Sequence, residues 1–230
     1  MSLRPIYYDT ETTGVKSDSD QIIELAAYDP VQNRSFVELI NPQRPIPAEA
    51  TAIHHITDEM VQAAPPFAEI GPRFLAFLDE NCVLIAHNND AFDLPFLSAA
   101  FKAINIDFPQ KTLFIDSLKW ARKYRPDLPR HSLQYLREIY GIASNTAHRA
   151  LDDVMVLCEV FSRLIDDLPM ETVLELLLIN QKITHMPFGK YQGQLLSEIP
   201  KSYFAWLTEN GALNKKTNAP LKSALEEQGL

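Results

Sequence analysis

The order of apolar and polar positions along the first 120 residues predicts a sheet with helices between its later strands. Five strands are expected, at residues 6–8, 21–29, 34–40, 83–86 and 113–115. The second and third are separated only by the turn from Pro30 to Asn33, and so short a connection implies antiparallel pairing. The later strands alternate with helical patterns. We therefore expect an α/β fold with a mixed sheet.

Helical periodicity occupies much of the remaining chain. Pro95 is tolerated only in a first helical turn, so Asp93 is expected at or just before a helix start. Asp116 and Ser132 are expected to cap two other helices, and Thr57 is a candidate cap for a short one. The stretch of Pro42, Pro45 and Pro47 is expected to be a loop. Helices are predicted at about 58–63, 68–80, 94–103, 117–124, 132–140 and 149–165.

The chain divides into a large body and a small tail. We expect one domain over residues 1–168, a helical linker over 169–182 and a small accessory module over 183–230. The module begins with a strand–turn pattern around residues 186–193, and two short amphipathic segments follow. No internal repeat or low-complexity tract interrupts this arrangement.

Composition narrows the class of protein. The apolar fraction is 46%, which can supply a sizeable core, and no apolar run approaches the roughly 20 residues of a membrane helix. The first five residues lack the apolar stretch of a signal peptide. Cys82 and Cys158 lie far apart in apolar surroundings, which is typical of free thiols in a reducing compartment. We expect a cytoplasmic protein with no membrane attachment, with secretion without a cleaved signal as the alternative.

Charge is distributed unevenly. The formal net charge is −9, which by itself argues against nonspecific adhesion to nucleic acid. Residues 1–180 hold 15 Lys and Arg against 26 Asp and Glu, whereas residues 181–230 hold 6 against 4. An acidic body with a mildly basic end fits a metal-dependent catalytic domain with an accessory piece. A solvated acidic surface fits as well.

Acidic residues stand at the ends of several predicted elements. Asp9 and Glu11 are two residues apart on an extended segment, so both carboxylates face the same side. Their repulsion calls for a shared proton or a divalent cation, unless they simply form a solvated strand end. Asp93 and the pair Asp152 and Asp153 follow further along the chain. Four carboxylates around one pocket would form an oxygen-rich cage suited to Mg²⁺ or Mn²⁺.

Three sequence motifs resemble those of the DEDDh family of 3′→5′ exonucleases, which includes proofreading subunits of bacterial DNA polymerases and exonuclease X. The motifs are Asp9-x-Glu11 with Thr12-Thr13-Gly14, then His87-Asn88-x-x-x-Phe92-Asp93, and finally His148-x-x-x-x-Asp153. The family usually has two residues between Asn and Phe in the middle motif, so either Asn88 or Asn89 takes the Asn position. The resemblance implies a ribonuclease H-like mixed five-stranded sheet with flanking helices.

The resemblance also implies residue roles. Asp9, Glu11, Asp93 and Asp153 would hold two Mg²⁺ ions, for which Mn²⁺ can substitute, and His148 would take a proton from the attacking water. Positions five apart on a helix differ by about 140°, so we expect His148 on the loop before the helix. Helix geometry alone would pair His148 with Asp152. The family pattern selects Asp153.

Further residues are candidates for contact with the substrate. In the family, the segment after the first carboxylate holds the 3′-terminal nucleotide, and an apolar residue wedges between bases. Val15 is a candidate for that wedge, with simple turn packing as the alternative. His54 lies in a segment similar to the family's His-x-Ile-Thr, although a structural loop histidine is equally consistent. The full set of candidate substrate contacts is Thr10, Thr12, Thr13, Val15, His54 and Phe92, and for Phe92 packing beneath the site is favoured.

The tail carries a second resemblance. Phe188-Gly189-Lys190-Tyr191-x-Gly193, with Pro200, Tyr203 and Trp206, is similar to the short C-terminal module of exonuclease X. Its mixture of cations and aromatic residues is typical of single-strand binders, and it is equally typical of the core of a small module. The body's basic cluster, Arg122-Lys123-Tyr124-Arg125 with Arg130, is a second candidate for phosphate contacts.

These observations together predict a two-metal 3′→5′ exonuclease that releases nucleoside 5′-monophosphates from DNA, with single-stranded ends as the expected substrate. The first alternative is an exoribonuclease of the same family. The second is a proofreading subunit associated with a DNA polymerase, for which Gln194-Leu195-Leu196 is too generic a clamp-binding segment. The third is a catalytically inactive nucleic-acid-binding module, which the intact acidic set disfavours. A homodimer is left open.

Overall fold

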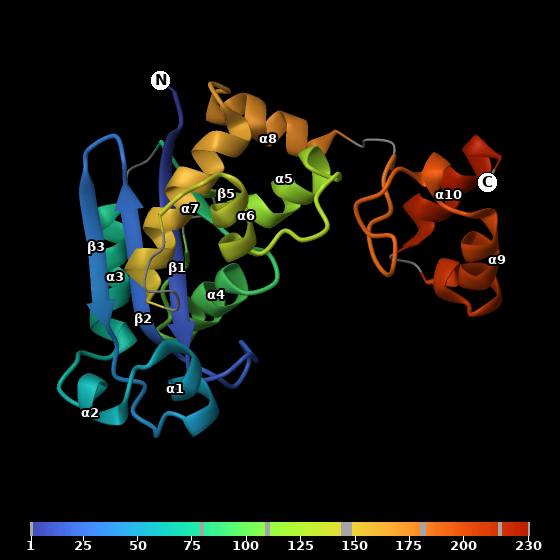
Figure 1. Cartoon of the computed structure of the whole chain (residues 1–230). Coiled ribbons are helices and arrows are strands. Elements are labelled where there is room, and N and C mark those ends of the chain that lie inside the picture. The colour runs from blue at the N-terminus through green and yellow to red at the C-terminus, as the bar shows by residue number, and fades with distance from the viewer. Residues whose placement is uncertain are drawn as a thin grey trace.

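The structure is a computed structural model that describes residues 2–78, 81–108, 111–143, 149–179, 183–215 and 218–229. A sheet flanked by helices forms the body, and a helical C-terminal module follows (Figure 1). The module is defined here as residues 183–229. Each predicted strand is present, and the strands are β1 (Arg4–Thr12), β2 (Ile22–Asp29), β3 (Arg34–Leu39), β4 (Cys82–Ala86) and β5 (Leu113–Asp116).

The sheet is mixed, as the pattern of connections predicted. Its strand order is β3-β2-β1-β4-β5. β1 pairs antiparallel with β2, and β2 with β3, whereas β1 pairs parallel with β4 and β4 with β5. β1 is therefore the central strand. β1 also extends beyond its parallel pairing with β4, which ends where Tyr7 lies opposite Ile85.

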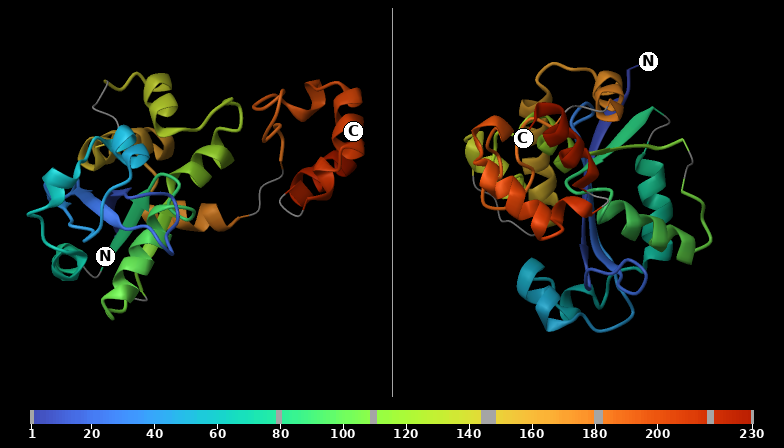
Figure 2. Two further views of the ribbon diagram at one scale, coloured as in Figure 1. Left: turned by 90° about the horizontal axis from the view of Figure 1, so that it is seen from below. Right: turned by 90° about the vertical axis from the view of Figure 1, so that its right-hand side faces the viewer.

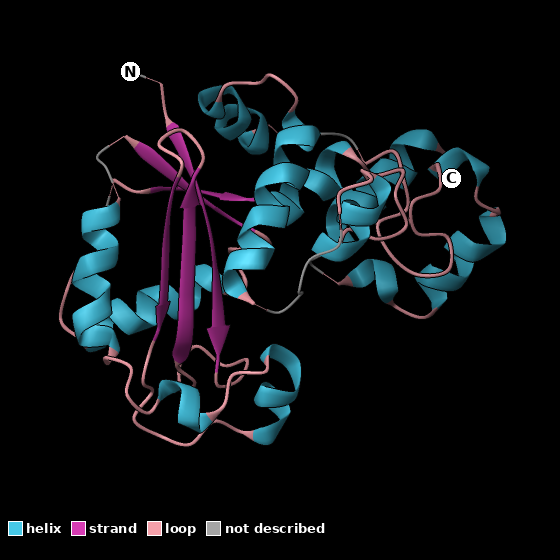
Figure 3. Cartoon of the chain, turned by 60° about the vertical axis from the view of Figure 1, so that its left-hand side comes forward, coloured by secondary structure: helices cyan, strands magenta, loops and turns pink. Residues whose placement is uncertain are grey.

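Helices cover both faces of the sheet (Figures 2 and 3). α3 (Phe67–Phe77) and α4 (Asp93–Ala103) pack on the face that receives Ile6 and Tyr8. α5 (Ser117–Tyr124), α7 (Ala150–Ile165) and α8 (Met170–Leu178) pack on the opposite face, with Tyr7. Because side chains alternate along a strand, the odd-numbered residues of β1 face α7. This parity decides where Asp9 and Glu11 point.

Helix boundaries follow local signals in the sequence. Asp93 is the first residue of α4, as predicted from Pro95. The Asp116 side chain accepts hydrogen bonds from the backbone amides of Leu118 and Lys119, which confirms the predicted cap of α5. Ser132 precedes α6 (Leu133–Ile139) and Thr57 precedes α2 (Asp58–Val61), but neither side chain forms a capping hydrogen bond there. Both helices therefore start where expected without that stabilisation.

Two segments differ from the sequence-based expectation. α1 (Ala48–His54) begins directly after the proline-rich stretch, with Pro47 at its N-cap. The prolines mark the approach to a helix, whose first residues are good helix formers. The predicted strand–turn pattern around residues 186–193 has its turn, in which the Gln192 amide donates to the Gly189 carbonyl at 3.1 Å, but one isolated bridge between His185 and Leu195 stands in place of regular strands. The elements that follow are η1 (Leu196–Glu198), α9 (Lys201–Glu209), η2 (Ala212–Asn214) and α10 (Ala219–Gln228).

The C-terminal module has an apolar cluster of its own, to which Met186, Phe204, Leu207 and Leu225 belong. It also meets the body closely. A Cβ atom at Gly193, where φ is +81°, would lie 2.9 Å from the backbone oxygen of Leu128, so only glycine fits this contact. The expected division at residues 168 and 182 stays a prediction.

Two smaller expectations concern location and thiols. Among the described helices, none combines the length and apolar character needed to span a bilayer. Within the described residues neither Cys82 nor Cys158 forms a disulfide, and Cys82 is buried whereas Cys158 is only partly so.

Candidate active site

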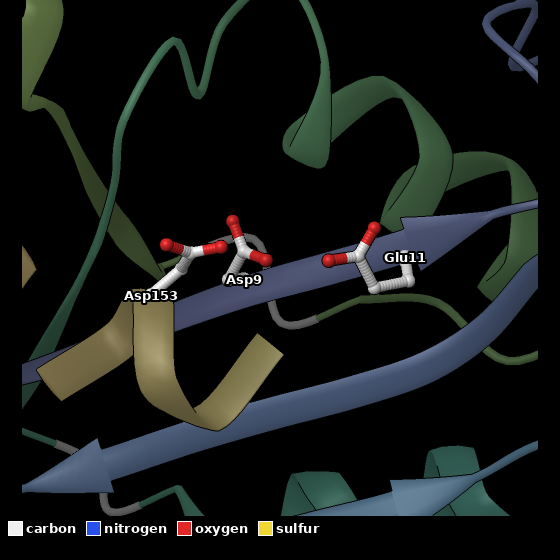
Figure 4. A group of neighbouring side chains, drawn as sticks. All are labelled: Asp9, Glu11 and Asp153. Atoms are coloured by element: carbon white, nitrogen blue, oxygen red, sulfur yellow. The ribbon is translucent and has the colours of Figure 1, made fainter. Parts of the chain in front are cut away.

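Three carboxylates from two elements converge on the α7 face of the sheet. Asp9 and Glu11 project from β1 and Asp153 from the first turn of α7, all toward the same space (Figure 4). One carboxylate oxygen from each lies within 4.8 Å of the others, and all three side chains are partly exposed. The odd parity of β1 and the packing of α7 on the same face place these carboxylates on one side of the sheet. Asp153, rather than Asp152, is the member of the pair that joins the cluster.

The cluster is electrostatically unfavourable without a cation. Burial, followed by the charges of Asp93, Glu11 and Asp153, raises the pKa of the Asp9 carboxyl well above its usual range. Burial and the nearby charges of Glu24 and Asp153 raise the pKa of Glu11 to about 8. Carboxylates this close repel one another unless a proton or a cation is shared. Oxygen donors of this kind at this spacing fit a hard divalent cation.

Asp93 reaches the same region from the other side of β1. Its Oδ1 accepts a hydrogen bond from the Thr10 amide at 3.1 Å and another from Thr10 Oγ1 at 2.8 Å. Thr10 lies beyond the part of β1 that pairs with β4, so the Asp93 carboxylate occupies the place that a continuing β4 would take. Burial raises the pKa of Asp93 to about 7. Asp93 adjoins Asp9 without belonging to the three-carboxylate cluster.

Glu24 is a site-adjacent acid that the sequence analysis missed. It lies directly opposite Glu11 in the β1–β2 pair and is 1% exposed. Its Oε2 accepts a hydrogen bond from the Ala150 amide at 3.1 Å, and its Oε1 lies 3.0 Å from Arg149 Nη2. Glu24 therefore anchors the first residues of α7, three positions before Asp153. A charged residue inside the otherwise apolar run Ile22–Ala27 was the signal available in the sequence.

Gln134 is the second residue that the sequence analysis missed. Its Nε2 donates a hydrogen bond to Asp153 Oδ1 at 3.1 Å. Its own Oε1 accepts a hydrogen bond from Arg137 Nε at 2.8 Å, one turn further along α6. The amide is thus held in one orientation, with its NH₂ group toward the carboxylate. α6 thereby fixes a side chain of the cluster from outside.

The middle motif supports the site structurally. Asn89 is fully buried, and its Oδ1 accepts a hydrogen bond from the Tyr8 hydroxyl. Asn88 has a left-handed backbone with φ of 72°. His87 Nε2 lies 2.9 Å from the His131 carbonyl oxygen, which can only accept, so this nitrogen carries the proton and Nδ1 accepts from Ser117. Burial lowers the pKa of His87 to about 4, and the imidazole is neutral.

The predicted catalytic base lies outside the described residues. His148 belongs to residues 144–148, immediately before Arg149, the N-cap of α7. Its predicted position on a loop and its role as a base both stay predictions. Ala150, whose backbone amide donates to Glu24, lies two residues after His148 in the sequence.

The candidate substrate-binding threonines have structural partners. Thr12 Oγ1 donates to the Gly14 carbonyl at 2.5 Å, and Thr13 Oγ1 accepts from the Gln21 amide at 3.0 Å. A Cβ at Gly14 would lie 2.4 Å from the Asp20 carboxylate, so glycine permits this close turn. Val15 follows with 80% of its side chain exposed. The turn therefore presents an apolar side chain to solvent, and the wedge role of Val15 stays a prediction.

The remaining candidates have structural contacts. His54 is 2% exposed, and its Nδ1 accepts a hydrogen bond from the Ile56 amide at 3.0 Å. Phe92 packs against Phe96, with ring centroids 5.0 Å apart, in agreement with the packing that was favoured for it. Within the basic cluster, Arg125 pairs with Asp127, and Lys123 Nζ donates to carbonyl oxygens near the end of α8. These interactions are consistent with structural roles and leave roles in binding untested.

Comparisons with known proteins agree with this geometry. A family model described as "Exonuclease" matches residues 6–161. A second, described as "Putative quorum-sensing-regulated virulence factor", matches residues 175–226. DNA polymerase III subunit epsilon of Treponema pallidum is 38% identical over 163 residues, which are 69% of this chain and 74% of that protein.

Two further comparisons show how much of each related protein this chain covers. The DNA polymerase III subunit epsilon-like protein of Rhodobacter capsulatus is 39% identical over 168 residues, which are 70% of this chain but 23% of that protein. A solved structure of exonuclease X in complex with 5′ overhanging duplex DNA aligns with a TM-score of 0.58 and 26% identity, and covers 70% of this chain and 91% of that one. The length shared with relatives therefore varies widely.

Proposed function

The chain belongs to the exonuclease family and is by that membership a 3′→5′ exonuclease, and on this premise we propose that it degrades DNA from single-stranded 3′ ends with the help of two Mg²⁺ ions. The observation that carries the proposal is the convergence of Asp9, Glu11 and Asp153 within 4.8 Å. Nucleoside 5′-monophosphates are the proposed products.

The donor set fits divalent metal ions, on which enzymes of this family depend. Three carboxylates with unfavourable mutual charge gain most from a cation that accepts oxygen ligands. Asp9, Glu11, Asp153 and the adjacent Asp93 would hold the ions. Two bound cations would supply a water of lowered pKa and would offset negative charge on the reacting phosphate.

The chain's own residues would do the rest. The hydrogen bonds of Glu24 and Gln134 hold the start of α7 and the Asp153 carboxylate in place. His148 is proposed to accept the proton of the attacking water, a task for which an imidazole is suited near neutral pH. Val15 is proposed to contact the terminal bases.

DNA is proposed as the substrate over RNA. The 38% identical relative is by name a DNA polymerase subunit, and the exonuclease X structure holds duplex DNA. The test is digestion of matched 5′-labelled single-stranded DNA and RNA in Mg²⁺, with EDTA as a control. A ladder shortened from the 3′ end and faster on DNA supports the proposal. A faster RNA ladder would replace it with the exoribonuclease alternative.

Site variants separate catalysis from binding. His148→Ala is expected to lower kcat about 10²- to 10⁴-fold. The matched control is His55→Asn, because His55 is exposed and asparagine tolerates its φ of 61°. Asp9→Ala is expected to abolish hydrolysis and to retain DNA binding. If the wild-type chain binds DNA without any hydrolysis, the inactive binding module is the better description.

Association with a DNA polymerase is the second candidate, because the relative from Treponema pallidum is named as a polymerase subunit. In that case a DNA polymerase should co-purify with the tagged chain in a fixed ratio.

Light scattering on the purified protein tests whether the chain forms a homodimer, since one chain has a mass of 26.1 kDa.

A further inference from the structure

Four side chains of the C-terminal module form a continuous aromatic and basic surface, here called the aromatic platform. Tyr203 and Trp206 on α9 stack with ring centroids 5.8 Å apart and planes 15° apart. Tyr191 meets Tyr203 edge to face at 4.8 Å. Lys190 Nζ lies 5.2 Å from the centre of the Tyr191 ring. The platform thus joins α9 to the loop that precedes η1.

The local sequence builds this platform. Tyr203 and Trp206 are three residues apart, so they share one side of α9. Gly189 has a φ of +78°, and a Cβ there would lie 2.5 Å from the Tyr203 hydroxyl. Glycine at this position lets the loop carrying Lys190 and Tyr191 approach the α9 aromatics.

Core packing does not account for Trp206. Phe204 and Leu207 on the same helix are 4% and 2% exposed, and they belong to the module's apolar cluster. Trp206 is 52% exposed. Among the large hydrophobic side chains that are exposed in the described part of the chain, Trp206 is the single aromatic residue. An exposed ring that stacks on Tyr203 is suited to bind a planar ligand such as a base.

The residue next to the platform, Gln192, lines two neighbouring hollows. Gln192, which follows Tyr191, lines a cavity of about 760 Å³ between the body and the module. It also lines a neighbouring pocket of about 360 Å³ that reaches His87 and Asn88 of the middle motif. Arg122 and His131 line both spaces. Arg122 thus places a cation on the wall of both spaces.

We propose that the aromatic platform binds the bases of single-stranded DNA upstream of the 3′ end, which rests on the proposed exonuclease function. Stacking of bases on aromatic rings is tolerant of sequence, and lysine beside the rings favours the phosphate backbone. Residues 181–230 carry a charge of +2 against −11 for residues 1–180. This charge favours an anionic partner, and the aromatic rings beside Lys190 favour a nucleic acid strand over an acidic protein surface.

Tryptophan fluorescence tests the contact directly. Trp120 is 2% exposed, so Trp206 is the tryptophan that a ligand can reach. An oligothymidylate of about 20 nucleotides, added to the full chain in EDTA, is expected to quench the fluorescence saturably. Trp206→Phe should remove the quenching. Undiminished quenching in Trp206→Phe would overturn the proposal.

Kinetics in Mg²⁺ test whether the enzyme uses the aromatic platform to bind its substrate. Trp206→Ala is expected to raise KM for the long oligonucleotide about tenfold. The rate on a trinucleotide, which is too short to reach the platform, should be unchanged. Equal KM values for wild type and variant would overturn the proposal and would favour a protein partner for this surface. Absence of hydrolysis of both oligonucleotides by the wild type would instead count against the exonuclease function itself.

A charge-matched pair controls for long-range effects and for misfolding. Lys190→Glu should weaken binding of the long oligonucleotide, whereas Lys222→Glu on α10 makes the same charge change away from the described platform contacts. A larger effect of Lys190→Glu supports the local site. Equal effects of both variants would show that only the net charge of the module matters, which overturns the proposal.

Discussion

The Glu24 carboxylate accepts a hydrogen bond from the Ala150 backbone amide at 3.1 Å. This bond joins the middle of β2 to the first residue of α7. Arg149 Nη2 donates to the other oxygen of the Glu24 carboxylate, Oε1, at 3.0 Å. A buried acid at this end of the helix also complements the helix dipole. The position of Asp153 therefore depends on a residue that belongs to neither β1 nor α7.

We expect Glu24→Gln to destabilise the fold and to impair catalysis. The amide can no longer accept from both Ala150 and Arg149, and an NH₂ group would face a donor. Leaving such a buried group unsatisfied costs about 1–3 kcal/mol. Urea unfolding should show this loss, and kcat should fall at saturating Mg²⁺. Glu38→Gln is the control, because its pair with Arg73 lies at the surface and surface pairs contribute about 0–1 kcal/mol. Equal losses in both variants would refute the anchoring role.

Removing one charge from the cluster should stabilise the chain in the absence of metal. Asp9→Asn removes the cost of burying this carboxylate and its repulsion from Asp93, Glu11 and Asp153, the causes that together raise the pKa of Asp9. In EDTA we expect Tm to rise by about 2–4 °C for each 1 kcal/mol relieved. In Mg²⁺ the wild type should gain Tm and the variant should gain less. Differential scanning fluorimetry measures both, with the exposed Asp18→Asn as control. A fall in Tm in EDTA would contradict the repulsion argument.

Sequence reasoning located the cluster because its geometry follows from periodicity. The strand period of two places Asp9 and Glu11 on one face, and Pro95 fixes Asp93 at a helix start. These constraints act between residues close in the chain. The pairing of Asp153 with β1 had to come from a family motif, since no local rule relates residues so far apart.

The missed residues act over long distances. Gln134 contacts Asp153 from a different helix, and nothing around it in the sequence marks it. Glu24 carried a signal, a charge within a buried strand, whose partners at Arg149 and Ala150 lie more than 120 positions away. The start of α1 was missed because prolines were taken to exclude a helix, although Pro47 stands just before its first residue. The tail's helices follow from local periodicity. Its loop is held by backbone hydrogen bonds between more distant positions, such as the Met186 amide to the Gln194 carbonyl at 2.8 Å and the Leu196 amide to the Thr184 carbonyl at 2.9 Å.

The stability of the metal-free chain should fall as pH rises. Glu11 has a pKa of about 8 in the folded chain against its ordinary value of 4.5. The folded state then binds the proton more tightly, so this contribution is complete below pH 4.5 and is lost between about 4.5 and 8. The measurement is the free energy of unfolding in urea and EDTA for wild type and Glu11→Gln. The difference between the two isolates Glu11 from His87, whose lowered pKa acts with the opposite sign. A pH-independent difference would refute the assignment.

Metal affinity should depend on Gln134 without its being a ligand. Gln134 Nε2 donates to Asp153 Oδ1, and Arg137 holds the Gln134 amide in that orientation. Losing an outer partner of a metal-binding carboxylate typically weakens affinity about 10- to 100-fold. Gln134→Ala should therefore shift the Mg²⁺ concentration for half-maximal activity upward. Near-normal kcat at saturating Mg²⁺ would mark Gln134 as a positioning residue, since a role in chemistry would lower kcat at every Mg²⁺ concentration.

The control is Gln194→Ala, at an exposed glutamine of the C-terminal module, which should leave the Mg²⁺ requirement unchanged. If both variants behave like wild type, the Asp153 carboxylate is held by the fold of α7 alone, and the contact from α6 is incidental.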